Sequence, residues 1–476
     1  MSNKRKILSL LDSSKRVLVI GDIILEKYVH GTYNRTSPEN SMPVFRIEKE
    51  EYRLAGTGNI IRNLLLMNLV VDVVSVIGNN DKIVLDLLKD MKLDMYGITR
   101  SQNYCVKTIT RYFCNKRLCF QTDNEENGEI PEEMKDTLLQ ITHILNSTNT
   151  YNCIVIASCG HKLVSTTIGQ YIIQEANLRG IPTIVDTNIK RDDHIFYGAT
   201  FLKLNHEEAN GICLTENEDL SIKCKNVCEQ FKAQVSMIMM LEKGLAFYKH
   251  NDVPPFQVIP MLDDVKMTDN CGAGDAALTA FVFGIIHQWT ITESCQFANS
   301  CTADVLERFG TASVSMINVI SQRVLTTQKE VKNLKWLIPE DATVVLTTGC
   351  FDIIHVGHVD SLRQAKDMGD ILIVALNSDV SVKSYKDDTR PIIPIEQRCR
   401  MLQDTKHVDF IVIFDESVPR WIVDILDPDI FAKGDEYNEE RIRKDFPSLR
   451  KICNTHDAPE VRELCTTYII DKIKKI

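Results

Sequence analysis

Short apolar runs alternate with longer amphipathic segments along the first part of the chain. Runs rich in Val and Ile predict buried strands at residues 16–20, 71–77, 153–157, 183–186 and 235–241. Apolar positions at helical spacing predict helices at residues 59–67 and 276–286. Strands that alternate with helices in this way indicate an α/β fold, in which a mostly parallel sheet is covered on both faces.

The same pattern begins again near residue 343. An apolar run at residues 343–346 predicts a strand, and residues 359–368 predict the helix that follows it. The segment before this strand is polar, is expected to be helical and ends at Pro339. At 476 residues the chain is too long for one ordinary core. We therefore expect a first domain of residues 1–317, a linker of residues 318–340 and a second domain of residues 341–476.

The composition narrows the classes of protein to consider. With 44% hydrophobic and 25% charged residues, the chain is typical of a soluble globular protein. A formal net charge of −10 without a basic stripe argues against a nucleic-acid partner. The 15 cysteines lack zinc spacing, so we assign no metal ligands and expect reduced thiols in the cytoplasm. No signal peptide or apolar span of about 20 residues is recognisable, so we expect no membrane association.

Two histidines form the most informative motif of the second part. His355 and His358 follow the strand at residues 343–346, with Gly357 between them, and stand where the next helix begins. Helix N-termini favour phosphate, and two imidazoles there can donate hydrogen bonds to charge that develops on a phosphoryl group. The motif resembles the signature of nucleotidyltransferases that join a nucleoside monophosphate to a phosphorylated partner. The simpler alternative is a pair of histidines that cap a helix.

Polar and glycine residues near this motif, and at later strand ends, are candidates for nucleotide binding. Lysines and an arginine that follow a strand at residues 371–375 can hold a triphosphate and the leaving pyrophosphate. A buried-looking region at residues 425–430 places a further lysine at another strand end. Read more simply, these are a solvated basic loop and ordinary helix caps. The candidates are Gly349, Phe351, Asp352, Lys383, Lys386, Arg390, Lys433, Thr466 and Thr467.

A second motif, Gly272-Ala273-Gly274-Asp275, precedes the helix expected at residues 276–286 in the first part. Its glycines expose successive amides at a helix start, which is a suitable anion hole for a transferred phosphoryl group. Asp275 is then placed to accept a hydroxyl proton as general base. Taken alone, the motif is equally well explained as a turn.

The other motifs of the first part change that balance. Asp22 ends the first strand, Gly56 and Asn59 precede a helix, and Asn205 and Glu208 form an N-x-x-E element. Together with Gly-Ala-Gly-Asp, they resemble the ribokinase-like (PfkB) carbohydrate kinases. The resemblance implies that Asn205 and Glu208 help to place Mg²⁺ and phosphate. Without it, these two residues are a helix N-terminus with a nearby acid.

Residues 31–44 carry a more specific resemblance. This stretch looks like the G-x-x-x-R-x-S-P-E-x-x-x-P-V segment of heptose 7-phosphate kinases, with Arg35 at the arginine position. Its prolines exclude an ordinary helix or central strand, so we expect a loop or edge hairpin over the sugar site. Arg35 would then meet the substrate phosphate. Otherwise this is a surface loop with Arg35 in solvent.

The order of the two halves, over nearly the whole chain, resembles the bifunctional heptose 7-phosphate kinase / heptose 1-phosphate adenylyltransferase family. The resemblance implies a ribokinase-like three-layer α/β/α kinase followed by a Rossmann-like nucleotidyltransferase. It implies phosphorylation of the anomeric hydroxyl of heptose 7-phosphate by ATP, and transfer of AMP from ATP to heptose 1-phosphate. It also implies Mg²⁺ in both reactions, sugar phosphates and ATP as partners, and a homodimer through the kinase half.

The kinase half departs from the family pattern at several positions. Asp-Pro-Lys has become Asp186-Thr187-Asn188, and Thr-Pro-Asn has become Lys203-Leu204-Asn205. Two alternatives therefore stay open beside the bifunctional enzyme. One is a nucleotidyltransferase, using ATP or CTP, whose kinase half acts on another sugar phosphate. The other is a kinase half that serves only as a dimerisation scaffold, against which the intact Asp275 argues.

Overall fold

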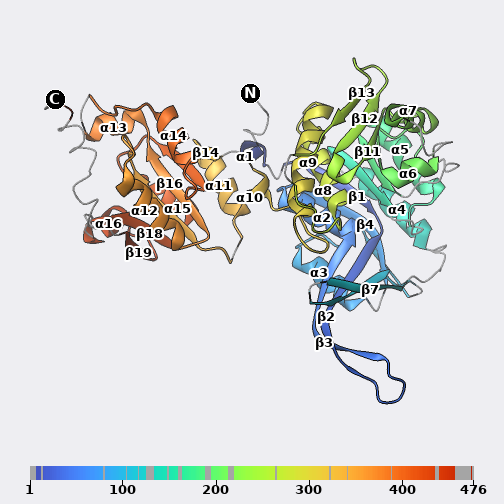
Figure 1. Cartoon of the computed structure of the whole chain (residues 1–476). Helices are drawn as coiled ribbons and strands as arrows, with labels where there is room; N and C mark the ends of the chain where they lie inside the picture. The colour runs from blue at the N-terminus through green and yellow to red at the C-terminus, as the bar shows by residue number, and fades with distance from the viewer. Residues whose placement is uncertain are drawn as a thin grey trace. The chain divides into compact units, whose positions relative to one another are not determined.

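The computed structural model describes residues 7–11, 14–78, 81–102, 104–115, 117–124, 133–146, 150–158, 163–187, 195–212, 219–262, 265–320, 323–339, 341–386, 389–434, 439–455 and 473. The chain forms two compact units. The first unit is Asp12–Val319, and the second combines Met1–Leu11 with Ile320–Ile476. Figure 1 shows the elements of each unit.

In the first unit, nine strands of the described residues form one sheet in the order β13-β12-β11-β10-β9-β8-β1-β4-β5. Pairing is parallel from β11 to β5, and only β12 and β13 are antiparallel. The strands are β1 (Arg16–Gly21), β4 (Val70–Gly78), β5 (Ile98–Ser101), β8 (Cys153–Ser158), β9 (Thr183–Thr187), β10 (Phe201–Asn205), β11 (Val235–Met239), β12 (Leu245–Lys249) and β13 (Phe256–Ile259).

The predicted strands of the first domain are confirmed, because their continuous apolar runs are buried on both faces of the sheet. One boundary differs from the prediction. The run at residues 235–241 leaves the strand at Met239, and Leu241–Lys243 form a 3-10 turn, η2. The chain must reverse there to pair β12 antiparallel with β11, and Gly244 makes the turn at φ 96°.

Helices cover both faces of this sheet (Figure 1), as predicted. One face packs against α4 (Glu133–Asn146), α5 (Thr166–Leu178), α6 (His206–Ile212) and α7 (Leu220–Gln230) through a core of aliphatic side chains. The other carries α2 (Thr57–Leu66), α8 (Ala273–Ile286) and α9 (Ile291–Leu306). Two further helices are α3 (Lys82–Asp90) and α10 (Met316–Val319). Helix α8 is apolar on nearly all sides because it is buried among neighbouring elements.

A separate four-stranded sheet of the first unit has the order β3-β2-β6-β7. Its strands are β2 (Ile23–Thr36), β3 (Pro43–Gly56), β6 (Thr108–Cys114) and β7 (Arg117–Asn124). β2 and β3 form the long hairpin at the bottom of Figure 1. The expected edge hairpin is therefore present: β3 is an edge strand, and Pro43 is its first residue.

In the second unit, all described strand pairs are parallel, in the order β14-β17-β16-β15-β18-β19. The strands are β14 (Val324–Leu325), β15 (Val344–Gly349), β16 (Ile371–Asn377), β17 (Phe410–Phe414), β18 (Ile430–Gly434) and β19 (Ile452–Thr455). Strand order reverses at β15, whose neighbours are β16 and β18. The carboxyl end of β15 is therefore the topological switch point, where ligands bind in such sheets.

Helices of the second unit flank this sheet. They are α1 (Ile7–Leu10), α11 (Gln328–Leu337), α12 (Val356–Asp367), α13 (Asp379–Tyr385), α14 (Ile395–Gln403), α15 (Arg420–Leu426) and α16 (Glu439–Asp445). Helix α11 is the helix expected between the two domains, and α1 packs against it, with Asn333 Nδ2 donating to the Leu11 carbonyl. No described helix is long and apolar enough to cross a membrane.

The interpretation of residues 425–430 as one buried stretch needs a correction. Helix α15 ends at Leu426, Asp427 turns the chain at φ 45°, and β18 begins only at Ile430. Apolar residues stand at both ends of the stretch because the end of a helix and the start of a strand are buried there. Lys433 still lies close to the end of a strand, within β18.

Candidate active sites

The first site lies at the start of α8. Gly272 is the N-cap residue of this helix and has a left-handed φ of 81°. A methyl group on Gly272 would also lie 2.9 Å from the Ala312 carbonyl oxygen, so both the conformation and the space require glycine. The backbone amides of Ala273 and Gly274 follow at the helix start, where an anion is favoured. Asp275 is in the first turn of α8, because the helix begins at Ala273 and not at residue 276 as expected.

Asp275 is held in a buried environment by groups from several elements. Asn59 Nδ2, on α2, donates to Asp275 Oδ2 at 2.7 Å. Burial raises the pKa of Asp275 to about 7, and the carboxylates of Asp186 and Glu26 act in the same direction. The hydrogen bond from Asn59 and the ammonium of Lys203 oppose this rise in pKa. Such a carboxyl can take up a proton near neutral pH, as a general base must.

Lys203 is a site residue that the sequence analysis did not assign. It lies on β10, is 6% exposed, and its Nζ donates to Asp186 Oδ2 on the neighbouring β9 at 2.7 Å. A methyl group on Gly274 would lie 3.4 Å from Lys203 Nζ, so the ammonium faces the anion hole at the start of α8. Burial lowers the pKa of Lys203, but the neighbouring acids Asp186, Glu208 and Asp275 raise it by more than burial lowers it. The pKa of Lys203 is therefore raised overall, and the ammonium stays charged.

The sequence did carry a signal for Lys203. The family pattern has lysine two positions after the aspartate of β9, where this chain has Asn188, and threonine where this chain has Lys203. Lys203 and Asp186 are direct partners in the parallel pairing of β10 with β9. Lys203 therefore lies beside Asp186 from the neighbouring strand, a relation that only the strand register makes visible.

Asn205 and Glu208 are placed together at the junction of β10 and α6. The Asn205 backbone N–H donates to Glu208 Oε2 at 2.7 Å, and the Glu208 N–H donates to Asn205 Oδ1 at 2.8 Å. This reciprocal arrangement is a capping box. Burial raises the pKa of Glu208, with a further contribution from Asp186. The N-x-x-E element thus caps a helix and also presents a carboxylate close to Lys203.

Asp22 and Gly56 lie at the junction of β1, the hairpin and α2. Asp22 is 2% exposed, and its carbonyl accepts from the Thr57 N–H at 3.1 Å. Gly56, at φ 56°, is the N-cap residue of α2, the helix that carries Asn59. Asp22 therefore adjoins α2, the helix whose Asn59 side chain contacts Asp275. In sequence, Asp22 is remote from Asp275.

Arg35 lies far from Asp22 of the same chain. It lies on the exposed part of β2, opposite Val44 and next to a register shift. With a rise of about 3.3 Å per residue, Arg35 is about 40 Å along the strand from Ile23. The predicted contact between Arg35 and the substrate phosphate stays a prediction.

The second site lies at the carboxyl end of β15. His355 is the N-cap residue of α12, and the ring centroids of His355 and His358 are 3.9 Å apart. The Phe351 ring lies 5.2 Å from the His358 ring. Burial, and then the neighbouring His355, lower the pKa of His358 to about 4. His358 is therefore neutral at pH 7, and a neutral imidazole still donates one hydrogen bond.

A cavity of about 370 Å³ opens at the carboxyl ends of β15, β16 and β18. Gly349 lines it, and so does Lys433, whose Nζ donates to the Thr348 carbonyl at 2.6 Å. Its full lining is Thr348, Gly349, Cys350, Asn377, Phe414, Ser417, Val418, Pro419, Phe431, Lys433, Arg441, Ile442, Asp445 and Phe446. The switch point predicted by strand order thus has room for a ligand.

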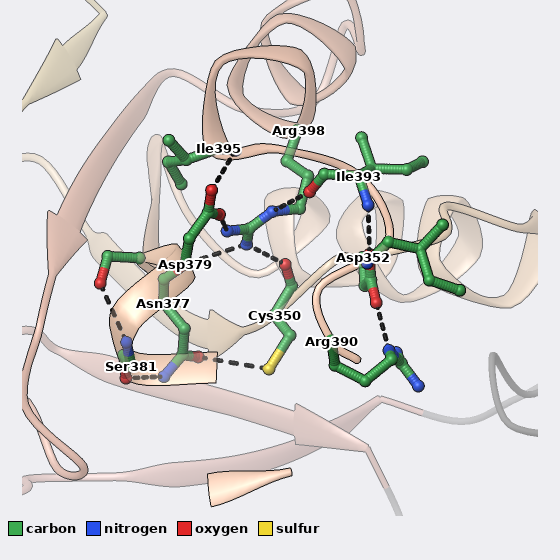
Figure 2. Close-up of polar contacts among 11 residues, drawn as sticks. Cys350, Asp352, Asn377, Asp379, Ser381, Arg390, Ile393, Ile395 and Arg398 are labelled. Carbon is green, nitrogen blue, oxygen red and sulfur yellow. Dashed lines mark hydrogen bonds and ion pairs between the residues drawn. The ribbon is translucent and has the colours of Figure 1, made fainter. Parts of the chain in front are cut away.

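Asp352 supports a neighbouring loop. It is 2% exposed, and its carboxylate accepts from Arg390 Nε and from the backbone N–H groups of Ile392 (2.8 Å) and Ile393 (2.9 Å) (Figure 2). It therefore fixes the position of Arg390. The other predicted cations, Lys383 and Lys386, are exposed at the carboxyl-terminal end of α13.

Arg398 is a second residue that the candidate set missed. Its guanidinium is fully buried, and it donates to the carbonyls of Cys350 (2.6 Å), Asn377 (2.8 Å) and Ile393 (2.9 Å) and to Asp379 Oδ1 (2.6 Å). Figure 2 shows these contacts converging on one side chain. Arg398 therefore joins the ends of β15 and β16 to the loop that carries Arg390. In the sequence it looks like one more solvated cation of a basic cluster.

Two of the predicted binding residues, Thr466 and Thr467, lie outside the described residues. Within the described part of the chain, no three His, Cys, Asp or Glu side chains are grouped so as to hold a metal ion. Mg²⁺ in phosphoryl-transfer sites is held by one or two carboxylates together with substrate phosphates. The half-buried carboxylate of Glu208, beside Asp186, fits that pattern because a cation would relieve the repulsion between the two acids.

Comparison with known families divides the chain in the same way. The family described as pfkB family carbohydrate kinase matches residues 14–317. The family described as cytidylyltransferase-like matches residues 346–469. These matches and the two sheets confirm the predicted architecture of two α/β domains, a ribokinase-like kinase followed by a nucleotidyltransferase.

Whole-chain relatives join both halves. The bifunctional protein HldE of Campylobacter fetus subsp. fetus is 32% identical over 90% of this chain and 93% of its own length. The bifunctional protein HldE of Helicobacter pylori (strain G27) is 28% identical over 97% and 99%. Among solved structures, phosphofructokinase-2 from Escherichia coli in complex with substrates and products has a TM-score of 0.52 at 14% identity, covering 64% of this chain and 97% of that one. This last likeness shows the fold of the first unit.

Proposed function

The chain belongs to the family of the bifunctional protein HldE, and from that premise we propose the two reactions that its sites catalyse. It is a bifunctional enzyme with heptose kinase and adenylyltransferase activity. In the first reaction, ATP phosphorylates the anomeric hydroxyl of heptose 7-phosphate. In the second, AMP passes from ATP to heptose 1-phosphate, giving ADP-heptose and pyrophosphate.

The observation that carries the kinase proposal is the half-buried Asp275, with its raised pKa, at a helix start that favours an anion. Asp275 takes the proton of the sugar hydroxyl while the hydroxyl oxygen attacks the terminal phosphorus of ATP. The amides that begin α8 and the ammonium of Lys203 face the phosphoryl group and neutralise its charge. ADP leaves on the opposite side, so the sugar gains a phosphate and Asp275 gains a proton.

The transferase needs no covalent enzyme intermediate. An oxygen of the sugar phosphate attacks the α-phosphorus of ATP, and pyrophosphate leaves. His355 and His358, at the start of α12, donate hydrogen bonds to the α-phosphate as its charge develops. Arg390, held by Asp352, and Lys386 face the leaving pyrophosphate in this proposal. Gly349 and Lys433 line the cavity at the carboxyl end of β15.

Both families use ATP, and we propose Mg²⁺ as the accompanying ion. Glu208 would hold it in the kinase site together with substrate phosphates. When bound, the ion supplies charge neutralisation on the phosphates. Asn205 keeps Glu208 in place through the reciprocal hydrogen bonds of the capping box.

We also propose that the kinase half forms a homodimer through the four-stranded sheet. Aromatic rings cross this sheet in a row, with Tyr33–Phe45, Phe45–Tyr112 and Tyr112–Phe120 centroids 5.1, 5.7 and 4.2 Å apart. Tyr33 is 42% exposed, Phe120 43% and the nearby Leu118 52%. An apolar, exposed sheet face is a suitable contact surface for a second copy. Sedimentation of Phe120→Arg as a monomer beside a dimeric unsubstituted protein would support the proposal, whereas equal sedimentation would contradict it.

Product analysis tests the two reactions directly. Purified protein is incubated with ATP and Mg²⁺ plus either heptose 7-phosphate or heptose 1-phosphate, and the products are identified by mass spectrometry. We expect heptose 1,7-bisphosphate from the first substrate and ADP-heptose from the second. Replacement of ATP by CTP in the second tube should give little product. Absence of the bisphosphate would mean that the kinase half acts on another sugar phosphate.

A further inference from the structure

The side-chain amide of Asn59 links a loop of the first unit to the candidate base. Ser313 Oγ donates to Asn59 Oδ1 at 3.3 Å, and Asn59 Nδ2 donates to Asp275 Oδ2 at 2.7 Å. Asn59 is 1% exposed, so water does not compete for these contacts. The three residues come from α2, α8 and the segment that follows α9.

The direction of this chain of hydrogen bonds is fixed by chemistry. A carboxylate accepts but does not donate, so the amide of Asn59 must present its NH₂ group to Asp275. Its carbonyl oxygen then faces Ser313, whose hydroxyl donates to it. A flipped amide would turn its oxygen to Asp275 and lose the contact with the ionised carboxylate. One carboxylate oxygen, Oδ2, is thereby occupied, and Oδ1 is left for the hydroxyl of a substrate.

We propose that Asn59 is a positioning residue of the kinase reaction, which holds the Asp275 carboxylate with Oδ1 directed at the sugar hydroxyl, and that Ser313 fixes the Asn59 amide. The sequence placed Asn59 among the substrate- and nucleotide-binding residues. The inference rests on the proposed kinase function. It adds that α2 controls the geometry and the protonation of the base on α8.

The charged groups around Asp275 come from other elements. They are Asp186 on β9, Lys203 on β10 and Glu26 on β2. From the described residues of α2, Asp275 receives the neutral donor Asn59. A hydrogen bond to the ionised carboxylate favours that form, so loss of Asn59 raises the pKa of Asp275. Loss of a cation or an acid from the other elements would leave the orientation of Oδ2 in place.

The same helix offers a matched control. Asn63 lies one turn after Asn59 on α2, is fully buried, and its Oδ1 accepts from the Val314 N–H at 2.7 Å. Asn63 thus ties α2 to the same segment as Asn59 does, but its Oδ1 binds the backbone and not the base. Asn63→Ala removes a buried polar contact of the same kind without touching Asp275.

The experiment compares Asn59→Ala, Ser313→Ala and Asn63→Ala in the full chain. Kinase kcat/KM is measured from pH 5.5 to 9, and the urea midpoint of the kinase activity of each preparation reports the integrity of the first unit. For Asn59→Ala we expect a loss of about 10²-fold at pH 7, since misplacement of a reacting group costs on that order. The acid limb of the kinase pH profile should move to higher pH, and part of the lost kcat/KM should be recovered at pH 9. Ser313→Ala should shift the limb in the same direction by less, and Asn63→Ala should leave it unmoved.

A second readout separates this inference from the proposed function. Carboxyl carbons of ¹³C-aspartate-labelled protein are titrated by NMR without substrate, and the Asp275 signal is identified by its absence from Asp275→Asn. The titration midpoint of Asp275 should be higher in Asn59→Ala than in the unsubstituted protein and in Asn63→Ala. An unmoved midpoint, or a raised KM for the sugar with an unmoved acid limb, would overturn the inference. Lack of turnover on heptose 7-phosphate would overturn only the proposed function.

Discussion

The kinase site is assembled from segments far apart in the sequence, whereas the transferase site is built around one continuous turn. Asp275 contacts Asn59, which is 216 positions away, and lies close to Lys203 on β10. His355, His358 and Phe351 lie within a few residues of one another. The transferase site still depends on distant support, because Arg398 joins its strand ends. Reacting groups can be local while the groups that hold them are not.

The two sites also use burial in different ways. Burial favours the neutral form of any ionisable group. In the kinase site it raises the pKa of Asp275 to about 7, so the base changes its charge near neutral pH. In the transferase site it lowers the pKa of His358 to about 4, so the donor keeps one protonation state across the neutral range. The same physical effect makes one site sensitive to pH and the other insensitive.

The largest expected effect comes from removal of the kinase base. Asp275→Asn keeps the shape and the contact with Asn59 but cannot accept the hydroxyl proton. Kinase kcat should fall by about 10²–10⁴-fold, the usual contribution of a general base. Coupled-enzyme assay of ADP release measures this loss, and ADP-heptose formation by the same protein should be unchanged. A parallel loss of both activities would mean that the two sites are not independent.

Removal of the buried arginine tests the distant support of the transferase site. Arg398→Ala leaves three carbonyl groups and Asp379 without their donor. We expect a loss of about 3 kcal/mol in the free energy of unfolding of the second unit, at the low end for a broken buried pair because Asp379 is 36% exposed. Urea midpoints of the two activities measure it, and only the transferase midpoint should move.

Arg400→Ala is the matched control for this prediction, since Arg400 lies on the same helix and is exposed. Its transferase midpoint should stay within error of the unsubstituted protein. Equal effects of the two substitutions would show that Arg398 contributes no more than a surface cation.

The next effect is loss of a hydrogen-bond donor at the transferase turn. His358→Ala should lower the transferase kcat by about 10²–10³-fold, the usual cost of one donor to developing charge. Single-turnover formation of ADP-heptose measures it, with heptose phosphorylation as the reference activity. If His358 only caps α12, the unfolding midpoint will fall while the rate of the folded fraction is kept.

The smallest effect is the contrast in pH dependence. The base form of Asp275 is ionised, so kinase kcat/KM should fall about tenfold for each pH unit below about 7. His358 is neutral well above its pKa of about 4, so transferase kcat/KM should be nearly level from pH 6 to 8. Initial rates of both reactions in one buffer series measure the contrast. A transferase profile with a midpoint near 6.5 would mean that His358 titrates as an exposed histidine does.

Much of the fold was predictable because buried parallel strands have continuous apolar runs in their sequence. The strands β1, β4, β8 and β9 were found in this way, and the helix starts with Gly-Ala-Gly-Asp and H-x-G-H followed from contiguous residues. Relations between segments were not predictable. The pair of Lys203 with Asp186 depends on strand register, and the burial of Arg398 depends on three carbonyl groups from distant loops.

The placement of α1 has a consequence for how the protein is made. Helix α1 packs on α11, Ile7 and Leu11 are each 1% exposed, and both belong to the second unit. Residues 12–319 lie between these two parts in the chain, so the ribosome completes the kinase unit before α11 emerges. During that interval the apolar side chains of α1 lack their eventual neighbours. The segment that is synthesised before the kinase unit is thus among the last to be buried.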